Sequence, residues 1–215
     1  MDNKKEFWEN LHKKGYHSFS VDIVWKYILN RMSKYFNGNI LDIGCGTGDL
    51  FLNIEKYINT YCGIDISNNV VDKCKKRFNN SKKFIEAKEC IGNGVIPYED
   101  NKFDIVSSCL VMQHIHIKFI EKYIEESYRV LVDNGLCIFH CADWKNAKRD
   151  SYFLNNNVDE NILMDHISGG IFSHNKESML PLFEKYKFDL IDYTEYNVDW
   201  EKNATWIIYV ARKRK

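Results

Sequence analysis

Three glycines lie at every second position after a short apolar run, in the stretch NILDIGCGTGDL (residues 39–50). Glycine lets a backbone turn tightly and come close to a ligand, because it has no side chain in the way. We expect a helix at residues 47–58, and the free N–H groups at the start of a helix favour a carboxylate or a phosphate. The stretch therefore predicts a loop that binds an anionic group of a small ligand.

An acidic residue closes the next apolar run. Asp65 ends the segment TYCGID (residues 60–65), 21 residues after Gly44. In nucleotide-binding sheets, an acid at the end of the second strand accepts hydrogen bonds from the hydroxyl groups of a ribose. The two features together predict a ligand that contains adenosine or a similar nucleoside.

The glycine spacing separates several kinds of nucleotide site. A dinucleotide-binding fingerprint reads GxGxxG, whereas this loop reads GxGxG and has Asp49 where the third glycine would stand. An acid there would repel a pyrophosphate, so an NAD-dependent oxidoreductase is the weaker alternative. A P-loop is excluded, because no Gly-Lys-Ser/Thr follows the glycines.

Four segments, in order, resemble the motifs of class I S-adenosylmethionine-dependent methyltransferases. ILDIGCGTGDL resembles their motif I, and YCGIDIS is similar to their second-strand motif. VIPYEDNKFDIVSSCLVMQHI resembles the segment around their fourth strand, and YRVLVDNGLCIF resembles the turn before their fifth strand. The resemblance covers residues 39–142 and implies an enzyme that uses S-adenosylmethionine and releases S-adenosylhomocysteine.

The resemblance also implies which residues hold the cofactor. Asp42 and the backbone of residues 44–48 would hold the amino and carboxylate groups of the methionine part, and Asp65 would hold the ribose. Ile66 would pack on the adenine, and either Glu89 or the backbone of Cys90 would face its amino group. The candidate cofactor-binding residues are Asp42, Gly44, Cys45, Gly46, Thr47, Gly48, Asp65, Ile66, Glu89, Cys90 and Cys109.

Two histidines are candidate catalytic residues. A neutral hydroxyl acceptor must lose its proton as it attacks a methyl group, and a histidine near its normal pKa suits that task. Ligands of such sheets meet at the carboxyl ends of the strands, which points to His114 after the fourth expected strand and to His140 in the fifth. His116 is expected instead to cap the helix that follows it.

The composition of the chain and the motifs that it lacks limit the partners and cofactors that we expect. The 30 basic and 30 acidic residues give no net charge, and no run of about 18 apolar residues exists, so we expect no nucleic-acid partner and no membrane span. Residues 110–114 read LVMQH and lack both acids of the Glu-x-x-Glu-His motif of metal-dependent relatives, so no metal is expected. The charged start of the chain and the seven unpaired cysteines favour a reducing cytoplasm.

Strand-like and helix-like segments alternate through the middle of the chain. This pattern predicts an α/β fold with a doubly wound, seven-stranded, mostly parallel sheet and helices on both faces. The last strand should run antiparallel, because only a short polar turn joins it to the strand before. We expect a single domain, residues 1–215, with four parts: a helical N-terminal cap (1–38), a cofactor-binding core (39–142), a lid or substrate insert (143–175), and a C-terminal helix with two strands (176–215).

The sequence as a whole predicts methyl transfer to an oxygen or nitrogen of a small molecule, such as a natural product, a sugar or a surface-glycan precursor. A protein or RNA methyltransferase is disfavoured by the neutral charge and the short accessory segments. A non-catalytic protein that binds S-adenosylmethionine stays open, since its cofactor site would look the same.

Overall fold

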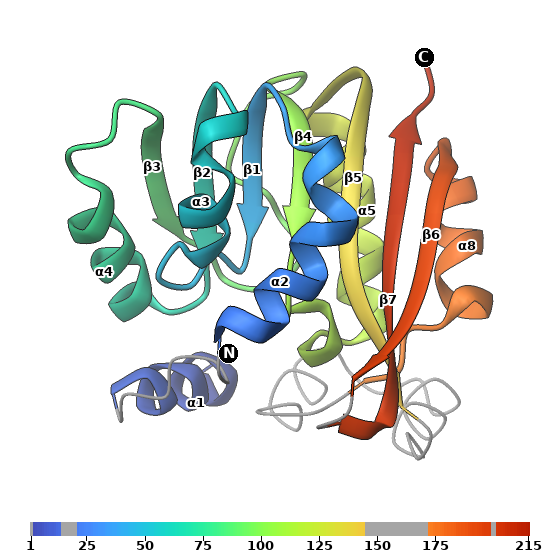
Figure 1. The fold of residues 1–215 in the computed structure, drawn as a ribbon, viewed down its shortest axis with the longest axis horizontal. Coiled ribbons are helices and arrows are strands. Elements are labelled where there is room, and N and C mark those ends of the chain that lie inside the picture. The colour runs from blue at the N-terminus through green and yellow to red at the C-terminus, as the bar shows by residue number, and fades with distance from the viewer. Residues whose placement is uncertain (1, 14–20, 145–171, 199–200) are drawn as a thin grey trace.

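Seven strands form one sheet in this computed structural model, which describes residues 2–13, 21–144, 172–198 and 201–215. The strands are β1 (Asn39–Ile43), β2 (Thr60–Asp65), β3 (Phe84–Glu89), β4 (Phe103–Ser108), β5 (Leu131–Trp144), β6 (Phe188–Val198) and β7 (Glu201–Lys213). Their order is β3-β2-β1-β4-β5-β7-β6. Neighbours from β3 to β5 pair in parallel, and β7 is antiparallel to both β5 and β6 (Figure 1). The predicted sheet, with its antiparallel last strand, is confirmed.

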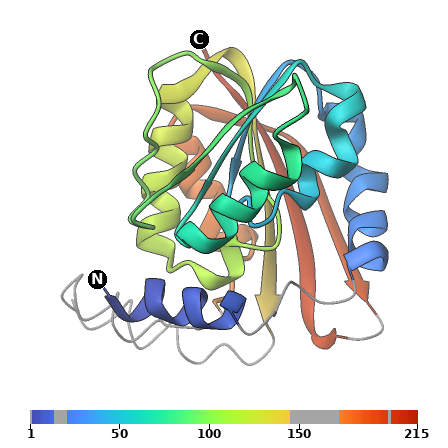
Figure 2. The same cartoon turned by 90° about the vertical axis from the view of Figure 1, so that its left-hand side faces the viewer.

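Helices cover both faces of the sheet, as Figure 2 shows from the side. The helices are α1 (Asp2–Lys13), α2 (Val21–Met32), α3 (Asp49–Ile54), α4 (Asn68–Phe78), α5 (Ile117–Val130) and α8 (Lys176–Lys185), with short 3₁₀ turns at Ser33–Tyr35, Glu55–Tyr57 and Met112–His114. Buried side chains of α2, α3 and α4 share one apolar core, and those of α5 and α8 share another. The sheet therefore separates two cores, as a doubly wound fold requires.

Alternate residues of the central strands face opposite cores. In β1, Ile40 packs into the core of α2 and α3, and Leu41 packs into the core of α5. In β5, Phe139 lies in the α5 core and Ile138 in the other. Because both sides of β5 are buried, its sequence does not alternate between apolar residues and exposed polar ones.

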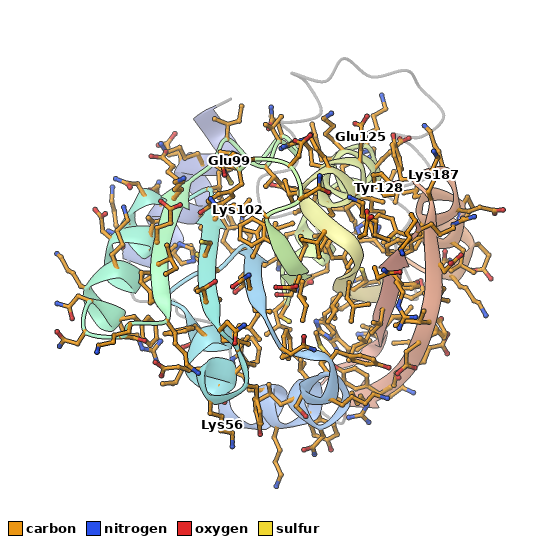
Figure 3. All side chains as sticks on the ribbon, turned by 90° about the horizontal axis from the view of Figure 1, so that it is seen from above. Lys56, Glu99, Lys102, Glu125, Tyr128 and Lys187 are labelled. Atoms are coloured by element: carbon orange, nitrogen blue, oxygen red, sulfur yellow. The ribbon has the colours of Figure 1, made fainter. Side chains whose placement is uncertain are left out.

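The carboxyl ends of β1–β5 meet at one edge of the sheet, and α1 lies across that edge (Figures 1 and 2). Figure 3 looks onto the opposite edge, where charged side chains lie around the rim. There Lys102 pairs with Glu99 at 2.9 Å, and the Tyr128 hydroxyl donates a hydrogen bond to the carbonyl of Arg214. The candidate site residues thus belong to the edge beneath α1, and this far edge carries ordinary surface ion pairs.

The segments around the sheet bear on two expected helix caps. His116 caps α5, because its Nδ1 accepts the N–H of Lys118 at 3.2 Å, which confirms its predicted role. Ser67 stands at the cap position of α4, but its hydroxyl makes no capping bond. Residues 145–171 of the expected insert, and residues 14–20 between α1 and α2, lie outside the described residues. In the described ranges, no helix is long and apolar enough to cross a membrane.

Candidate functional site

The glycine loop after β1 has the backbone shape that its sequence predicts. Gly44, Gly46 and Gly48 all have positive φ angles, of 75°, 51° and 86°. A side chain on Gly44 would overlap Val111, and one on Gly48 would overlap Phe78. A Cβ on Gly46 would meet no atom within 4 Å in the part of the chain that the structure describes. Gly46 is therefore the glycine of this loop that faces open space, where a ligand can approach the backbone.

Asp65 organises the backbone around that open space. Its two carboxylate oxygens each accept an N–H at 2.9 Å, one from Gly46 and one from Ser67. Burial raises the pKa of Asp65, and these N–H donors work in the opposite direction. The loop is tied to the same strand through Gly44 and Cys45, whose N–H groups both donate to the carbonyl of Ile64. The end of β2 thus fixes the glycine loop.

Asp42 lies under the loop rather than at its surface. It is 3% exposed, and its Oδ2 accepts a hydrogen bond from the Tyr61 hydroxyl at 2.7 Å. Burial raises the pKa of Asp42 to about 7, although the hydrogen bond from Tyr61 lowers it. A carboxyl group with this pKa can gain or lose a proton near neutral pH.

The residues expected at the adenine follow the end of β2 or lie at the end of β3. Ile66 packs against Gly92, where an added Cβ would come within 2.8 Å of its Cδ1. Glu89 ends β3 and forms an ion pair with Lys5 of α1. The N–H of Cys90 already donates to the carbonyl of Asp65 at 2.8 Å. The two predicted partners of the adenine amino group, Glu89 and the backbone of Cys90, are thus both held at the end of β3.

Arg77 of α4 braces the far end of the glycine loop. Its guanidinium donates to the carbonyl of Thr47 at 3.1 Å and to the carboxylate of Asp49 at 2.6 Å. The negative charge of Asp49, which follows the glycine loop, is therefore paired with the guanidinium of Arg77. Cys45 and Thr47 hold the loop through their backbone and lie between these two anchors.

The segment after β4 lies directly on the glycine loop. Cys109 is buried, and burial together with the nearby Asp42 carboxylate raises the pKa of its thiol. Leu110 has a φ of 62°, a conformation that costs a non-glycine residue about 1–2 kcal/mol. Val111 comes next and packs against Gly44. Strained residues of this kind persist only where their surroundings hold them in place.

His140 contacts the backbone of Leu110. It is fully buried in β5, and its Nδ1 accepts the N–H of Leu110 at 3.3 Å. Its Nε2 lies 2.7 Å from the hydroxyl oxygen of Tyr196, and its ring stacks on Trp206 at 5.0 Å. Burial lowers the pKa of His140 to about 3. Both ring nitrogens are occupied, so this histidine is badly placed to take a proton from an acceptor.

His114 has a different environment. It ends the 3₁₀ turn Met112–His114, is partly exposed, and packs edge-on against Trp8 of α1 with ring centroids 5.0 Å apart. Its N–H donates to the carbonyl of Val111 at 2.8 Å. Of the two predicted histidines, His114 is therefore the one that reaches the surface beneath α1.

The chain returns to this edge after residues 145–171. The N–H of Phe172 donates to the carbonyl of Gln113, and the N–H of His174 donates to the carbonyl of Ala142, both at 2.8 Å. His174 is fully buried, and burial lowers its pKa to about 4. Residues 172–174 thus lie next to the turn that carries His114, and His174 is buried among its neighbours.

Sequence reasoning missed four residues of this site. They are Tyr61, Arg77, Val111 and Tyr196. Each acts on a predicted residue from another element, and strand order and helix placement bring these pairs together. The positive φ at Leu110 gave no sequence signal, because leucine rarely adopts it.

Known proteins resemble this chain in sequence and in fold. A family model described as "Methyltransferase domain" matches residues 41–139. The ubiquinone/menaquinone biosynthesis C-methyltransferase UbiE of Campylobacter jejuni is 32% identical over an alignment of 178 residues, and the alignment covers 75% of this chain and 69% of that protein.

Two solved structures share the fold at low identity. A putative S-adenosylmethionine-dependent methyltransferase from Listeria monocytogenes has a TM-score of 0.67 and 17% identity, covering 89% of this chain and 98% of that one. Phosphoethanolamine N-methyltransferase 2 of Haemonchus contortus, solved with S-adenosylhomocysteine and phosphomonomethylethanolamine, has a TM-score of 0.64 and 17% identity over 89% of this chain and 53% of its own. With the glycine loop and the sheet order described above, these matches identify the chain as a member of the class I S-adenosylmethionine-dependent methyltransferases.

Proposed function

We propose that the open space beside Gly46 holds S-adenosylmethionine, with the predicted residues around it. The observation that supports this is that no atom of the described residues lies within 4 Å of a Cβ on Gly46, next to the Asp65 carboxylate. The backbone of residues 44–48 and Asp42 would hold the methionine part, Asp65 the ribose, and Ile66 and Glu89 the adenine. The cofactor supplies a methyl group on a positively charged sulfur, already activated for transfer.

We further propose that the acceptor is a small molecule, methylated at an oxygen or a nitrogen that loses a proton to His114. His114 is partly exposed beneath α1, and its backbone is joined to Val111, the residue that packs on the glycine loop. Trp8 of α1 offers aromatic surface beside it, and Phe7 packs on Trp8. Aromatic side chains with a few polar groups are typical of small-molecule sites. We expect the enzyme to work in the cytoplasm, where its seven free thiols would stay reduced.

Carbon methylation is a second candidate, favoured by the name of the C-methyltransferase from Campylobacter jejuni. A phenol or hydroquinone that loses its hydroxyl proton becomes nucleophilic at ring carbon as well as at oxygen. A base in the position of His114 would serve either outcome. The two candidates therefore differ in the atom that receives the methyl group and share the residue that removes the proton.

Product analysis separates these outcomes. The full chain would be incubated with S-adenosylmethionine carrying a ¹³C-labelled methyl group, and with catechol, 4-aminophenol and 1,4-naphthohydroquinone in separate reactions. The ¹³C chemical shift of the product distinguishes a methyl group on oxygen, nitrogen or carbon. We expect an oxygen or nitrogen product; a methyl group only on carbon would favour the second candidate. Binding of S-adenosylhomocysteine without turnover on any acceptor of a wider panel would point to a non-catalytic protein.

His114→Ala is expected to lower turnover far more than cofactor binding. A general base contributes about 10²–10⁴-fold to a rate, so kcat should fall by roughly that factor for a hydroxyl acceptor. The affinity for S-adenosylhomocysteine, measured by calorimetry, should stay within about twofold, because no bond to the loop is lost. Full turnover in His114→Ala would remove this residue from the chemistry. His116→Ala is not a suitable control, since it uncaps α5.

Asp42→Asn is expected to remove the loss of stability that Asp42 causes as the pH rises through 7, and to weaken cofactor binding. The folded chain holds the Asp42 carboxyl at a pKa of about 7 against an ordinary value of 3.8. Its contribution to stability is therefore complete below pH 4 and is lost as the pH rises through 7. Asparagine still accepts the Tyr61 hydroxyl, so the free energy of unfolding at pH 8 should rise by roughly 2–4 kcal/mol over the natural chain.

Thermal unfolding without ligand, at pH 5 and pH 8, measures this effect. The variant and the natural chain should differ most at pH 8. Calorimetry at pH 8 should show weaker binding of S-adenosylmethionine, whose amino group loses a carboxylate partner. If the difference in unfolding temperature between the variant and the natural chain were the same at pH 5 and pH 8, this would contradict the buried, protonatable state of Asp42. Unchanged binding would remove Asp42 from the methionine site.

A further inference from the structure

His140 connects two parts of the fold that are far apart in the sequence. Its ring lies in the middle of the sheet, on the side of β5 that faces the α2 and α3 core. Nδ1 faces the turn after β4, and Nε2 faces Tyr196 of β6. Such a buried histidine needs an explanation beyond packing, because a phenylalanine would fill the same volume without polar atoms to satisfy.

The hydrogen bonds fix the tautomer of His140. The backbone N–H of Leu110 can only donate, so Nδ1 must be the unprotonated acceptor. Nε2 then carries the proton and donates to the Tyr196 hydroxyl oxygen at 2.7 Å. The ring is held by this bond and by stacking on Trp206, with ring planes 3° apart. Nδ1 is thus presented to Leu110 in one fixed direction.

The consequence of that bond reaches the cofactor loop. Leu110 has a positive φ, which leucine adopts only when it is held there. The next residue, Val111, packs against Gly44, and its carbonyl accepts the N–H of His114. A change at Leu110 would therefore move both the residue that covers the glycine loop and the turn that carries His114.

We propose that His140 is a positioning residue for methyl transfer: its Nδ1 holds Leu110 in the left-handed conformation that seats Val111 on the cofactor loop and orients His114. The proposal gives His140 no contact with the cofactor or the acceptor. It rests on the cofactor placement proposed above, and binding of S-adenosylhomocysteine to the natural chain tests that placement separately.

Replacements of His140 and of Tyr196 separate the effects of the two hydrogen bonds that the His140 ring makes. His140→Asn places an amide oxygen where Nδ1 stands and can still accept the N–H of Leu110. His140→Phe keeps the ring and its stacking on Trp206 but has no acceptor. We expect His140→Asn to bind S-adenosylhomocysteine within about threefold of the natural chain, and His140→Phe to bind about tenfold more weakly. Tyr196→Phe removes the hydrogen bond at Nε2 and leaves the one between Nδ1 and Leu110 in place. This variant should change the affinity for S-adenosylhomocysteine by less than about twofold.

A double replacement tests the role of Leu110 directly. Glycine adopts a positive φ without strain, so Leu110→Gly should remove the need for an acceptor at His140. In the Leu110→Gly background, adding His140→Phe should weaken S-adenosylhomocysteine binding by less than about twofold, so the two changes are not additive. Calorimetry of the four chains of this cycle measures the coupling.

A merely structural role for His140 predicts a different pattern. The temperature of thermal unfolding would then be lower in His140→Phe than in the natural chain. S-adenosylhomocysteine binding would stay unchanged at a temperature where the variant is folded. Equal losses of binding with and without Leu110→Gly would also overturn the proposal. If His140→Phe does not fold, the comparison of His140→Asn with His140→Gln decides, since glutamine places its amide at the Nε2 side. Equal affinity of these two variants would contradict an acceptor role for Nδ1.

Discussion

Replacing Gly46 with valine is expected to abolish measurable binding of S-adenosylmethionine in a chain that still folds. Its Cβ would enter the open space beside the loop, where no atom of the described residues lies within 4 Å. The φ of 51° adds strain of about 1–2 kcal/mol in a non-glycine residue, which the fold can absorb. We expect the affinity for S-adenosylhomocysteine to fall more than about a hundredfold, or about 2.7 kcal/mol.

Gly48→Val is the matched control for this result. Gly48 has a similar positive φ, of 86°, but its Cβ would overlap Phe78 and come within 2.9 Å of the Cys74 sulfur. This variant should lose thermal stability, because its side chain has nowhere to go. Calorimetry and thermal unfolding of both variants separate the two effects. Strong binding by a folded Gly46→Val chain would show that no ligand approaches the backbone there.

Asp65→Ala is expected to weaken cofactor binding by roughly 1–3 kcal/mol, from the loss of charge-assisted hydrogen bonds. The side chain acts twice in the proposed site, since it accepts the N–H of Gly46 and would accept the ribose hydroxyls. Its removal leaves the N–H groups of Gly46 and Ser67 without their acceptor. We expect calorimetry to show weaker binding both of S-adenosylhomocysteine and of adenosine alone.

Adenosine is the informative ligand, because it lacks the methionine part. Asp65→Asn keeps one carbonyl oxygen and should fall between the alanine variant and the natural chain. Gly46→Val should lose more affinity for S-adenosylhomocysteine than for adenosine, whereas Asp65→Ala should weaken both. An unchanged adenosine affinity in Asp65→Ala would refute the ribose assignment and leave Asp65 as a residue that only ties the loop.

Much of the architecture could be predicted because it depends on local pattern. Strands and helices alternate visibly from β1 to β5, and the short turn before β7 forces an antiparallel return. The glycine spacing and Asp65 are equally local, since a tight turn and a strand end determine them. The histidine at the start of α5 was predicted as a cap for the same reason.

The rest of the site depends on contacts between distant segments. The sequence around His140 could not show which side of β5 is buried, because two helical layers bury both. Its role as an acceptor needs Leu110 in a conformation that leucine disfavours. The pKa of Asp42 depends first on burial and then on the hydrogen bond from Tyr61 of the neighbouring strand. No periodicity in the chain encodes these pairings.

One helix touches both halves of this edge. Lys5 of α1 pairs with Glu89 beside the expected adenine, Glu9 accepts the N–H of Asn69 at the start of α4, and Trp8 packs on His114. A ligand that displaces α1 from one half changes the free energy of its contacts with the other. With the cofactor and the acceptor bound as proposed, this helix would link their affinities thermodynamically, and any factor by which one ligand changes the affinity for the second would apply equally in the other direction.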